Sequence, residues 1–386
     1  MSYWRHNRSS IALALVTLAF CIYLPSLQAA SDSSAEEAVT PGQYIVSTAN
    51  LPFEPARVGL NLQWTQRLPA KENQATITDI YGLPELLLVQ TFNANLIAFN
   101  ADSGTWHGGI SMNAQVSQPP IRWKRWVLAI CQTNLLMLNM DESELKVERR
   151  VGIVPSAPFV THKNRVIVPT ESAEVVAIDV RSGKREWSFK PGGAVRGGLV
   201  LDKNTVYAAA YKGGIVAADV DTGSVKWSWE PSNSSLAASN PAAENGFVFV
   251  GDTHGFVHCL SKDIGLPQWK YPTGSPVEEC ISLPAKKLLV TTHRGDTLCL
   301  SSRRSPEESR LLWTISGSHT FLTHGQKRLY LLSEKDHSLL AVSMEDGKEI
   351  WRRKLPEDIK LKAGAKKGSL YLYTESGEVI ALSEAK

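Results

Sequence analysis

The sequence is organised by an eleven-residue pattern that occurs four times without a gap. In the copy that begins at Ala177, a small residue is followed by Gly183 six positions later and by Trp187 ten positions later. The other complete copies are Ala217, Gly223 and Trp227; Cys259, Gly265 and Trp269; and Ala341, Gly347 and Trp351. Such constant spacing indicates one structural unit repeated along the chain, because unrelated strands would not keep it.

Looser copies of the pattern complete a regular series. The first positions of all copies are residues 98, 137, 177, 217, 259, 299, 341 and 381, so neighbouring copies are 39 to 42 residues apart. The copy at Met137 has lost both Gly and Trp, and the chain ends before the copy at Ala381 is complete. We therefore expect eight units of one repeat fold.

The residue types within the pattern suit a β-hairpin that carries a tryptophan. Apolar residues before the turn predict a strand, and the Asp-x-x-Ser/Thr-Gly run predicts a tight loop in which glycine takes a positive φ angle. The second strand then brings the indole back over the first position, where Ala or Cys leaves room for the ring. Because a buried Trp removes a large apolar area from water, we expect it to seal one sheet against the next.

Each repeat has room for four short strands. In the fourth unit the turns separate four expected strands, at residues 197–201, 205–209, 214–219 and 225–229. The segment around Trp64 resembles a Trp-bearing strand without its predecessor, and the segment at Ala381 is the reverse, so the two chain ends are expected to complete one sheet. The sequence predicts an all-β, eight-bladed β-propeller of four-stranded antiparallel blades, closed by an N-terminal strand, with a seven-bladed ring as the alternative.

The first 29 residues have the features of a secretory signal peptide. Arg5 and Arg8 precede an apolar run at residues 11–24, and a Leu-Gln-Ala sequence that suits cleavage ends at Ala29. We expect residues 30–54, which are small and polar, to be a disordered leader, and residues 55–386 to form the propeller domain. The N-terminal pattern thus predicts export.

Cys21 raises the question of a lipid anchor. Leu18-Ala-Phe20 precedes it and resembles a bacterial lipoprotein box, except that Phe20 stands where Gly, Ala or Ser is expected. Lipidation at Cys21 and an uncleaved membrane anchor therefore stay open.

Charge and cysteine content exclude some classes of function. The 41 basic and 38 acidic residues leave a net charge of +3, or +1 without the two arginines of the signal peptide, so no net basic charge favours nucleic acid. The four remaining cysteines are Cys131, Cys259, Cys280 and Cys299. Two of them occupy the small-residue position of the repeat, which predicts buried apolar side chains and no disulfide framework.

The gap-free copies resemble the PQQ-like repeat with its tryptophan-docking motif. With the length and the export signal, residues 55–383 resemble the BamB-like family, the propeller subunits of bacterial outer-membrane barrel assembly. The resemblance implies a periplasmic protein, peripheral to the outer membrane and monomeric, with a BamA-like barrel-assembly protein as its partner. The docking residues are structural in every family that uses the motif, so they do not identify the activity.

Quinoprotein alcohol dehydrogenases share this repeat and bind PQQ and Ca²⁺ at the propeller axis. The resemblance to them implies a vicinal disulfide on the quinone and a carboxylate and amide set around the calcium, but the chain has no Cys-Cys dipeptide. No haem-attachment motif, serine-nucleophile elbow or phosphate-binding glycine loop is present. We therefore predict no catalytic, cofactor-binding or metal-binding residues.

Two segments are candidates for partner binding. In BamB-like proteins a short apolar and Arg segment before the innermost strand of a middle blade contacts the partner, and Ala194, Val195 and Arg196 stand at that place. The second candidate is the basic and aromatic stretch at residues 121–126, whose Trp123 and Trp126 lie outside the docking positions and suggest an exposed aromatic contact. An ordinary surface connection and core packing of a Trp are the respective alternatives.

The hypothesis that follows is an exported, non-enzymatic propeller scaffold that binds an envelope protein in outer-membrane protein assembly. A PQQ-dependent or other quinoprotein oxidoreductase is one alternative. A carbohydrate-binding or cell-surface-binding module is the other.

Overall fold

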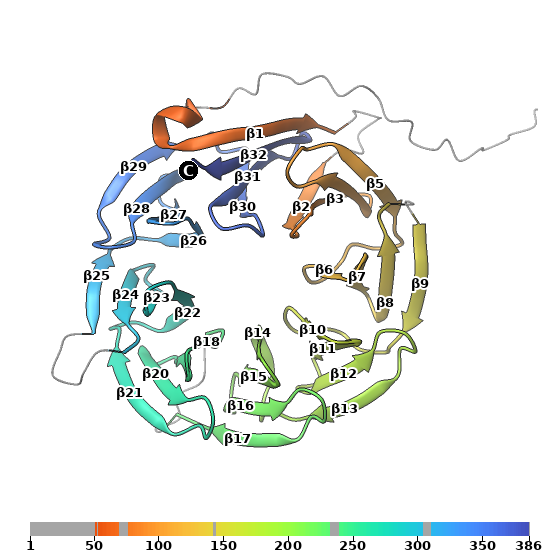
Figure 1. Ribbon diagram of the computed structural model, residues 1–386, viewed down its shortest axis with the longest axis vertical. Helices are drawn as coiled ribbons and strands as arrows, with labels where there is room; N and C mark the ends of the chain where they lie inside the picture. The colour runs from red at the N-terminus through yellow and green to blue at the C-terminus, as the bar shows by residue number, and fades with distance from the viewer. Residues whose placement is uncertain are drawn as a thin grey trace, which may run out of the picture. The chain divides into compact units, whose positions relative to one another are not determined.

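Eight antiparallel sheets surround one axis in the computed structural model, which describes residues 51, 53–68, 76–141, 144–231, 239–303 and 310–385 (Figure 1). Each sheet has four strands, so the predicted eight-bladed propeller is confirmed and the seven-bladed alternative is wrong. The predicted signal peptide and all of the predicted leader except Leu51, Phe53 and Glu54 lie outside the described residues. In the described part of the chain, no helix has the length and apolar character needed to cross a membrane.

The strands of a blade follow chain order from the axis outwards. The innermost strands are β2 (Ile77–Gly82), β6 (Ile121–Trp123), β10 (Val160–His162), β14 (Val195–Asp202), β18 (Ala242–Glu244), β22 (Val277–Leu283), β26 (His319–His324) and β30 (Ile359–Ala363). The second strands are β3 (Leu86–Thr91), β7 (Trp126–Cys131), β11 (Arg165–Pro169), β15 (Thr205–Ala210), β19 (Phe247–Gly251), β23 (Lys287–Thr292), β27 (Arg328–Ser333) and β31 (Ser369–Thr374).

The outer half of each blade is the hairpin that carries the repeated sequence pattern. The third strands are β4 (Asn95–Asn100), β8 (Asn134–Asn139), β12 (Val175–Asp179), β16 (Gly214–Asp219), β20 (Phe256–Ser261), β24 (Thr297–Ser301), β28 (Ser338–Ser343) and β32 (Glu378–Glu384). The outermost strands are β5 (Trp106–Ser111), β9 (Glu144–Arg150), β13 (Arg185–Phe189), β17 (Val225–Trp229), β21 (Pro267–Pro272), β25 (Leu311–Ile315), β29 (Glu349–Lys354) and β1 (Leu60–Arg67). We number the blades 1 to 8 by their innermost strands, so that blade 4 is β14–β17 and blade 8 is β30–β32 with β1.

Blade 8 closes the ring with both ends of the chain. After the short helix η1 (Pro55–Val58), β1 pairs antiparallel with β32, so that Trp64 lies opposite Ala381. The N–H of Ala385 donates to the carbonyl oxygen of Gly59 over 3.0 Å. The predicted closure by an N-terminal strand is therefore confirmed, and β1 pairs with the edge of β32 that would otherwise be free.

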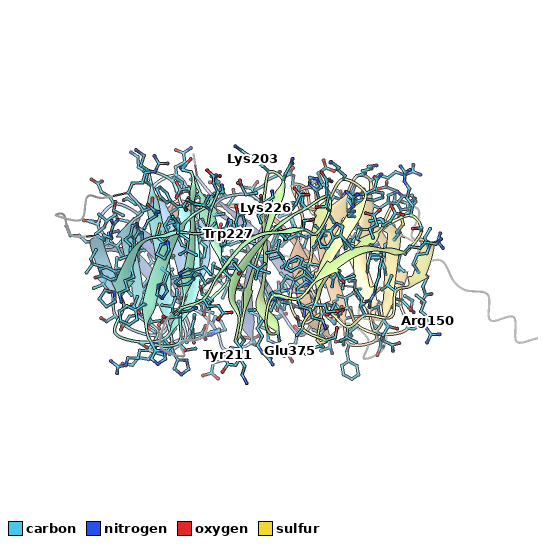
Figure 2. All side chains as sticks on the ribbon, turned by 90° about the horizontal axis from the view of Figure 1, so that it is seen from below. Arg150, Lys203, Tyr211, Lys226, Trp227 and Glu375 are labelled. Atoms are coloured by element: carbon cyan, nitrogen blue, oxygen red, sulfur yellow. The ribbon has the colours of Figure 1, made fainter. Side chains whose placement is uncertain are left out.

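The ring has two faces, which we name by residues labelled in Figure 2. The innermost strands begin on the Tyr211 face, where the turns between second and third strands also lie, including Tyr211 and Glu375. The Lys203 face carries the turns between first and second strands and the hairpin turns of the repeat. β14 connects the two faces, because Val195 pairs with Ala210 at one end and Asp202 pairs with Thr205 at the other.

The core is divided among the spaces between neighbouring blades. Eight separate clusters of buried apolar residues are present among the described residues, and each joins two adjacent blades. All six residues of β3 and the first four of β12 are buried. Both surfaces of a blade are covered by its neighbours, so these strands are apolar without interruption.

Within each hairpin the small residue lies opposite the tryptophan. Ala177 pairs with Trp187, Ala217 with Trp227, Cys259 with Trp269, and Ala341 with Trp351. The register shifts immediately after each of these pairs, which is a recurrent β-bulge. In blade 1, Trp106 lies opposite Phe99 and Gly108 occupies the place opposite Ala98, so the looser copy there does not put its Trp at the docking position.

The glycine and the tryptophan of one repeat contact different neighbours. The indole of Trp227 in blade 4 covers Gly265 in blade 5, where a Cβ atom would lie 2.5 Å from its Cε3 atom. Its Nε1–H donates to the carbonyl oxygen of Lys262 over 2.9 Å. Indoles also cover glycines of the following blade in the pairs Trp64–Gly104, Trp187–Gly223 and Trp313–Gly347. Each indole therefore joins its own blade to the next one.

Blade 2 replaces the missing tryptophan with an arginine. Val147 lies opposite Met137, and the aliphatic part of Arg149 covers Gly183, where a Cβ atom would lie 3.0 Å from the Cβ of Arg149. The Nε–H of Arg149 donates to the carbonyl oxygen of Arg181 over 3.1 Å. A long side chain with an apolar stem and a hydrogen-bonding end thus substitutes for the indole.

The removal of one docking indole should destabilise the whole ring. Trp227→Ala is expected to lower the free energy of unfolding by about 3–5 kcal/mol, because a large buried aromatic side chain is lost. Val225→Ala, on the same strand but with a side chain that is 51% exposed, is the matched control and should change it by less than about 0.5 kcal/mol. Denaturant unfolding measures both, and equal stability of the two variants would contradict the docking role.

A comparison of two glycines with positive φ angles distinguishes the stability cost of backbone strain from that of a steric clash. Gly246 has a φ of 91° and open space for at least 4 Å around the position that a Cβ atom would take, whereas Gly265 has a φ of 70° and lies against Trp227. Gly246→Ala should cost about 1–2 kcal/mol of stability through backbone strain alone. Gly265→Ala should cost about 1–3 kcal/mol more, because the indole must also move. Melting curves that do not distinguish the two variants would show that the indole tolerates a methyl group.

Candidate functional site

A cavity of about 430 Å³ lies on the Tyr211 face, where innermost strands of several blades begin. Blades 4, 6 and 7 contribute most of it, through the first residues of β14, β22 and β26. We call it the axial cavity, and its lining residues are Arg196, Gly197, Asn240, Glu278, Glu279, Thr291, His319, Thr320 and Phe321.

The axial cavity carries charges of both signs. Arg196 is exposed at the start of β14, and Glu278 and Glu279 are adjacent on β22. Burial, with the charge of Glu278 as a smaller cause, raises the pKa of Glu279 above the ordinary value for a glutamate. Glu278 also accepts a hydrogen bond from His293, with 2.9 Å between Oε1 and Nδ1 when that nitrogen is protonated. A ligand that offers both a carboxylate and a cationic group would match this surface.

Polar side chains line the wall beneath these charges. His319 is buried, and burial lowers the pKa of its imidazole, so the ring is neutral at pH 7. The Oδ1 atom of Asn240 is buried and has no hydrogen-bond partner among the described residues. Gly197 lets this amide approach the backbone of β14, since a Cβ atom there would lie 1.8 Å from Oδ1. The wall therefore offers hydrogen-bonding groups as well as charge.

The three residues of the predicted contact segment in blade 4, where β14 starts, differ in exposure. Val195 is only 1% exposed and packs in the cluster between blades 3 and 4. Ala194 is half-buried, and its carbonyl oxygen accepts the N–H of Tyr211 over 2.9 Å. Arg196 alone turns an exposed side chain to the axial cavity. A contact through the Val195 side chain is therefore ruled out by its burial.

The expectation of an exposed aromatic contact was wrong for Trp123. Its side chain is buried between blades 2 and 3, and its Nε1–H donates to the carbonyl oxygen of Lys163 over 2.6 Å. Trp126 is half-buried against the same cluster, with the guanidinium of Arg125 4.9 Å from its ring centroid. The two tryptophans lie opposite each other in the two strands of one hairpin, and both pack against the cluster between blades 2 and 3.

Glu278, Glu279 and His319 were not predicted as site residues. Arg196 and Glu278 each stand 19 residues after the small residue of the preceding repeat, Ala177 and Cys259 respectively. A comparison of equivalent positions in the repeats could therefore have placed both charges at one end of an innermost strand. It could not have shown which blades meet around a cavity, because that depends on how the ring closes.

A second cavity, of about 440 Å³, lies on the Lys203 face beside the closure of the ring. We call it the seam cavity. Blade 8 contributes the turn at residues 365–367 and the last residues of the chain, and blade 1 contributes Asp102. Glu384 lines this cavity, and its side chain is held in place because it accepts hydrogen bonds from the N–H of Gln326 over 2.8 Å and the hydroxyl of Tyr330 over 3.3 Å.

The reactive side chains elsewhere are held in structural roles. All four described cysteines are free and buried, and burial raises the pKa of Cys259, Cys280 and Cys299 to about 12. They therefore behave as the buried apolar residues expected from the repeat. Across the described ranges, no group of three or more His, Cys, Asp or Glu side chains is arranged to hold a metal ion.

Comparisons with solved structures place this architecture among known propellers. BamB from Moraxella catarrhalis is 17% identical with a TM-score of 0.66, over 84% of this chain and 97% of that one. The computationally designed Ika8 protein is 12% identical with a TM-score of 0.62, over 81% of this chain and 98% of that one. The quinohemoprotein alcohol dehydrogenase ADHIIG from Pseudomonas putida HK5 is 10% identical with a TM-score of 0.60, over 85% and 76%. At these identities the likeness shows the fold alone.

The comparison with protein families is more specific. A search of curated proteins found no match. A family profile described as outer membrane protein assembly factor BamB matches residues 142–353, which is more than half of the chain. This match covers the gap-free copies of the repeat and the segment that contains Arg196. The chain therefore belongs to the BamB family of PQQ-like β-propellers.

Proposed function

We propose that the protein is an exported, non-catalytic scaffold that binds an envelope protein partner during outer-membrane protein assembly. The family description and the likeness to BamB from Moraxella catarrhalis support this role. The observation that carries it is the position of Arg196, which is exposed at the mouth of the axial cavity on a rigid strand. In this proposal the monomeric propeller presents its Tyr211 face to a BamA-like barrel-assembly protein.

The chemistry of the axial cavity defines the partner segment. A guanidinium binds a carboxylate through two parallel hydrogen bonds, so Arg196 suits an acidic side chain of the partner. Glu278 and Glu279 suit a basic side chain in the same segment. Because β14 and β22 belong to sheets packed on both surfaces, the backbone that carries these groups is ordered before binding, which reduces the ordering entropy that binding must overcome.

The cellular placement belongs to the proposal as well. The signal-peptide pattern around Arg5 and Arg8 predicts export, and Cys21 would be the site of any lipid anchor. An exported member of this family is expected at the periplasmic face of the outer membrane, peripheral to the bilayer.

The oxidoreductase alternative rests on the shared fold. The likeness to the dehydrogenase from Pseudomonas putida HK5 is at 10% identity, and function is carried by sites grafted on a fold rather than by the fold. The absorption spectrum of the protein purified from its native envelope tests this alternative. A retained quinone chromophore would contradict the non-catalytic role.

Arg196→Glu should abolish partner binding without loss of the fold. We expect crosslinks in the native envelope between the tagged protein and a barrel-assembly protein to fall at least about tenfold, since reversing one charge of a close pair removes attraction and adds repulsion. Mass spectrometry of the covalent partners measures the change. Arg150→Glu is the matched control, because Arg150 is also an exposed arginine but ends the outermost strand β9, away from the axial cavity and from the turns nearest the axis, and it should leave these crosslinks intact.

Two outcomes would contradict the proposal. Recovery of only unrelated envelope proteins or glycan fragments from the wild type would require a different role for the propeller. Equal crosslinking of the wild type and the Arg196→Glu variant would move the binding site away from the axial cavity.

A further inference from the structure

The turns between the first and second strands, which lie nearest the axis on the Lys203 face, carry many basic residues, which we call the basic rim. Six of the eight turns contribute to it, and Glu85 is the one acidic residue that these eight described turns contain. The residues of the basic rim are Lys124, Arg125, Lys163, Lys203, Lys286, Lys327, Lys366 and Lys367. Positive charge is therefore gathered in the turns nearest the axis, in a chain whose net charge is only +3, while the hairpin turns farther from the axis on the same face carry acidic residues such as Asp263 and Asp346.

The geometry of the turns gives no reason for these lysines. Lys124, Lys163 and Lys203 are the first residues of two-residue turns and have φ values of 55°, 54° and 50°. Glycine, asparagine and aspartate are the residues that such turns favour. The equivalent residue in blade 5, Asn245, follows that preference. Three lysines at positions where the backbone favours other residues point to a use for their charge.

Part of the rim is neutralised and part is free. Lys163 pairs with Asp221 of the next blade over 2.8 Å, and Lys366 pairs with Asp102. Lys203, Lys327 and Lys367 are exposed, and within the described ranges the structure gives them no hydrogen bond or ion pair. Their ammonium groups come from blades 4, 7 and 8, so the free charge is spread along the rim rather than focused on one point.

Exposed apolar side chains and the start of the first described strand lie on the same face. Ile264 and Leu266, in the hairpin turn of blade 5, are 60% and 56% exposed. The chain also enters the propeller here, because Leu60 lies opposite Glu384 at the Lys203 end of β32. The predicted export signal and Cys21 precede β1 in the sequence.

We propose that the basic rim binds the surface of a membrane that contains anionic phospholipids. Phosphate groups in a plane can accept hydrogen bonds from ammonium groups spread over several blades, and Ile264 and Leu266 can enter the interfacial region beside them. A membrane tether in the N-terminal segment would hold the rim at high effective concentration near such a surface, so weak individual contacts are sufficient. The proposal concerns the opposite face from the axial cavity and does not depend on the partner proposed there.

Vesicle binding of the full chain tests this proposal. The rim variant carries Lys203→Gln, Lys327→Gln and Lys367→Gln. The matched control carries Lys190→Gln, Lys212→Gln and Lys335→Gln, three exposed lysines on the Tyr211 side of the ring. Both variants lose the same charge and retain the same N-terminal segment, so a difference between them reports on the rim alone. Equal melting temperatures establish that both are folded.

Binding to phosphatidylcholine vesicles with and without phosphatidylglycerol is measured by co-sedimentation. We expect the wild type and the control to prefer the anionic vesicles, and the rim variant to bind them about 100-fold more weakly, since each lysine near an anionic surface contributes about fivefold. The preference should also fall as ionic strength rises, because salt screens exposed charges.

Several results would overturn the proposal. Equal binding of the wild type to both kinds of vesicle would show that the N-terminal segment or apolar contact alone is responsible. Equal losses in the rim variant and the control would show a general charge effect. Loss of protein crosslinks in the rim variant, without vesicle binding by the wild type, would assign the rim to an acidic protein. None of these results bears on the crosslinks expected at Arg196.

Discussion

The contact between an indole and a glycine of the next blade is the interaction on which the ring depends. A blade has two apolar surfaces and cannot bury either one alone, so its stability comes from its neighbours. Trp227 spans such a boundary, with its ring on Gly265 and its N–H on the carbonyl oxygen of Lys262. One side chain thereby provides both apolar burial and a hydrogen bond between two sheets. Arg149 shows that the boundary tolerates another residue when it supplies both functions.

When the ring closes, the contacts between neighbouring blades link all eight sheets into one ring with two different faces. Because β1 and β32 come from opposite ends of the chain, no blade can separate from the ring without breaking a neighbour's core. Innermost strands of blades 4, 6 and 7 then place Arg196, Glu278 and His319 around one cavity. The turns at the other ends of the innermost strands place lysines on the opposite face. The ring can therefore hold a protein on one side and a charged surface on the other.

The repeat pattern predicted strands well and exposure poorly. The four strands expected in blade 4 agree with β14–β17 to within two residues at every end, because turn residues and apolar runs are local signals. The exposed contact suggested for Trp123 and Trp126 and the alternative of core packing could not be distinguished from the sequence, since strand alternation alone cannot say which surface of a sheet is covered. In a propeller both surfaces are covered, and the indole of Trp123 packs in the cluster between blades 2 and 3.

The sequence by itself determined the hairpin that carries each docking residue and the use of both chain ends to close the ring, and it predicted eight blades while leaving a seven-bladed ring open. These features follow from local spacing, since one period of 39 to 42 residues repeats along the chain. Only the tertiary structure decided that the Trp of one repeat covers the Gly of the next, and that Arg196 faces Glu278 and Glu279. Those contacts join residues more than 30 positions apart, and their geometry is set by the curvature of the closed ring rather than by any local preference of the chain.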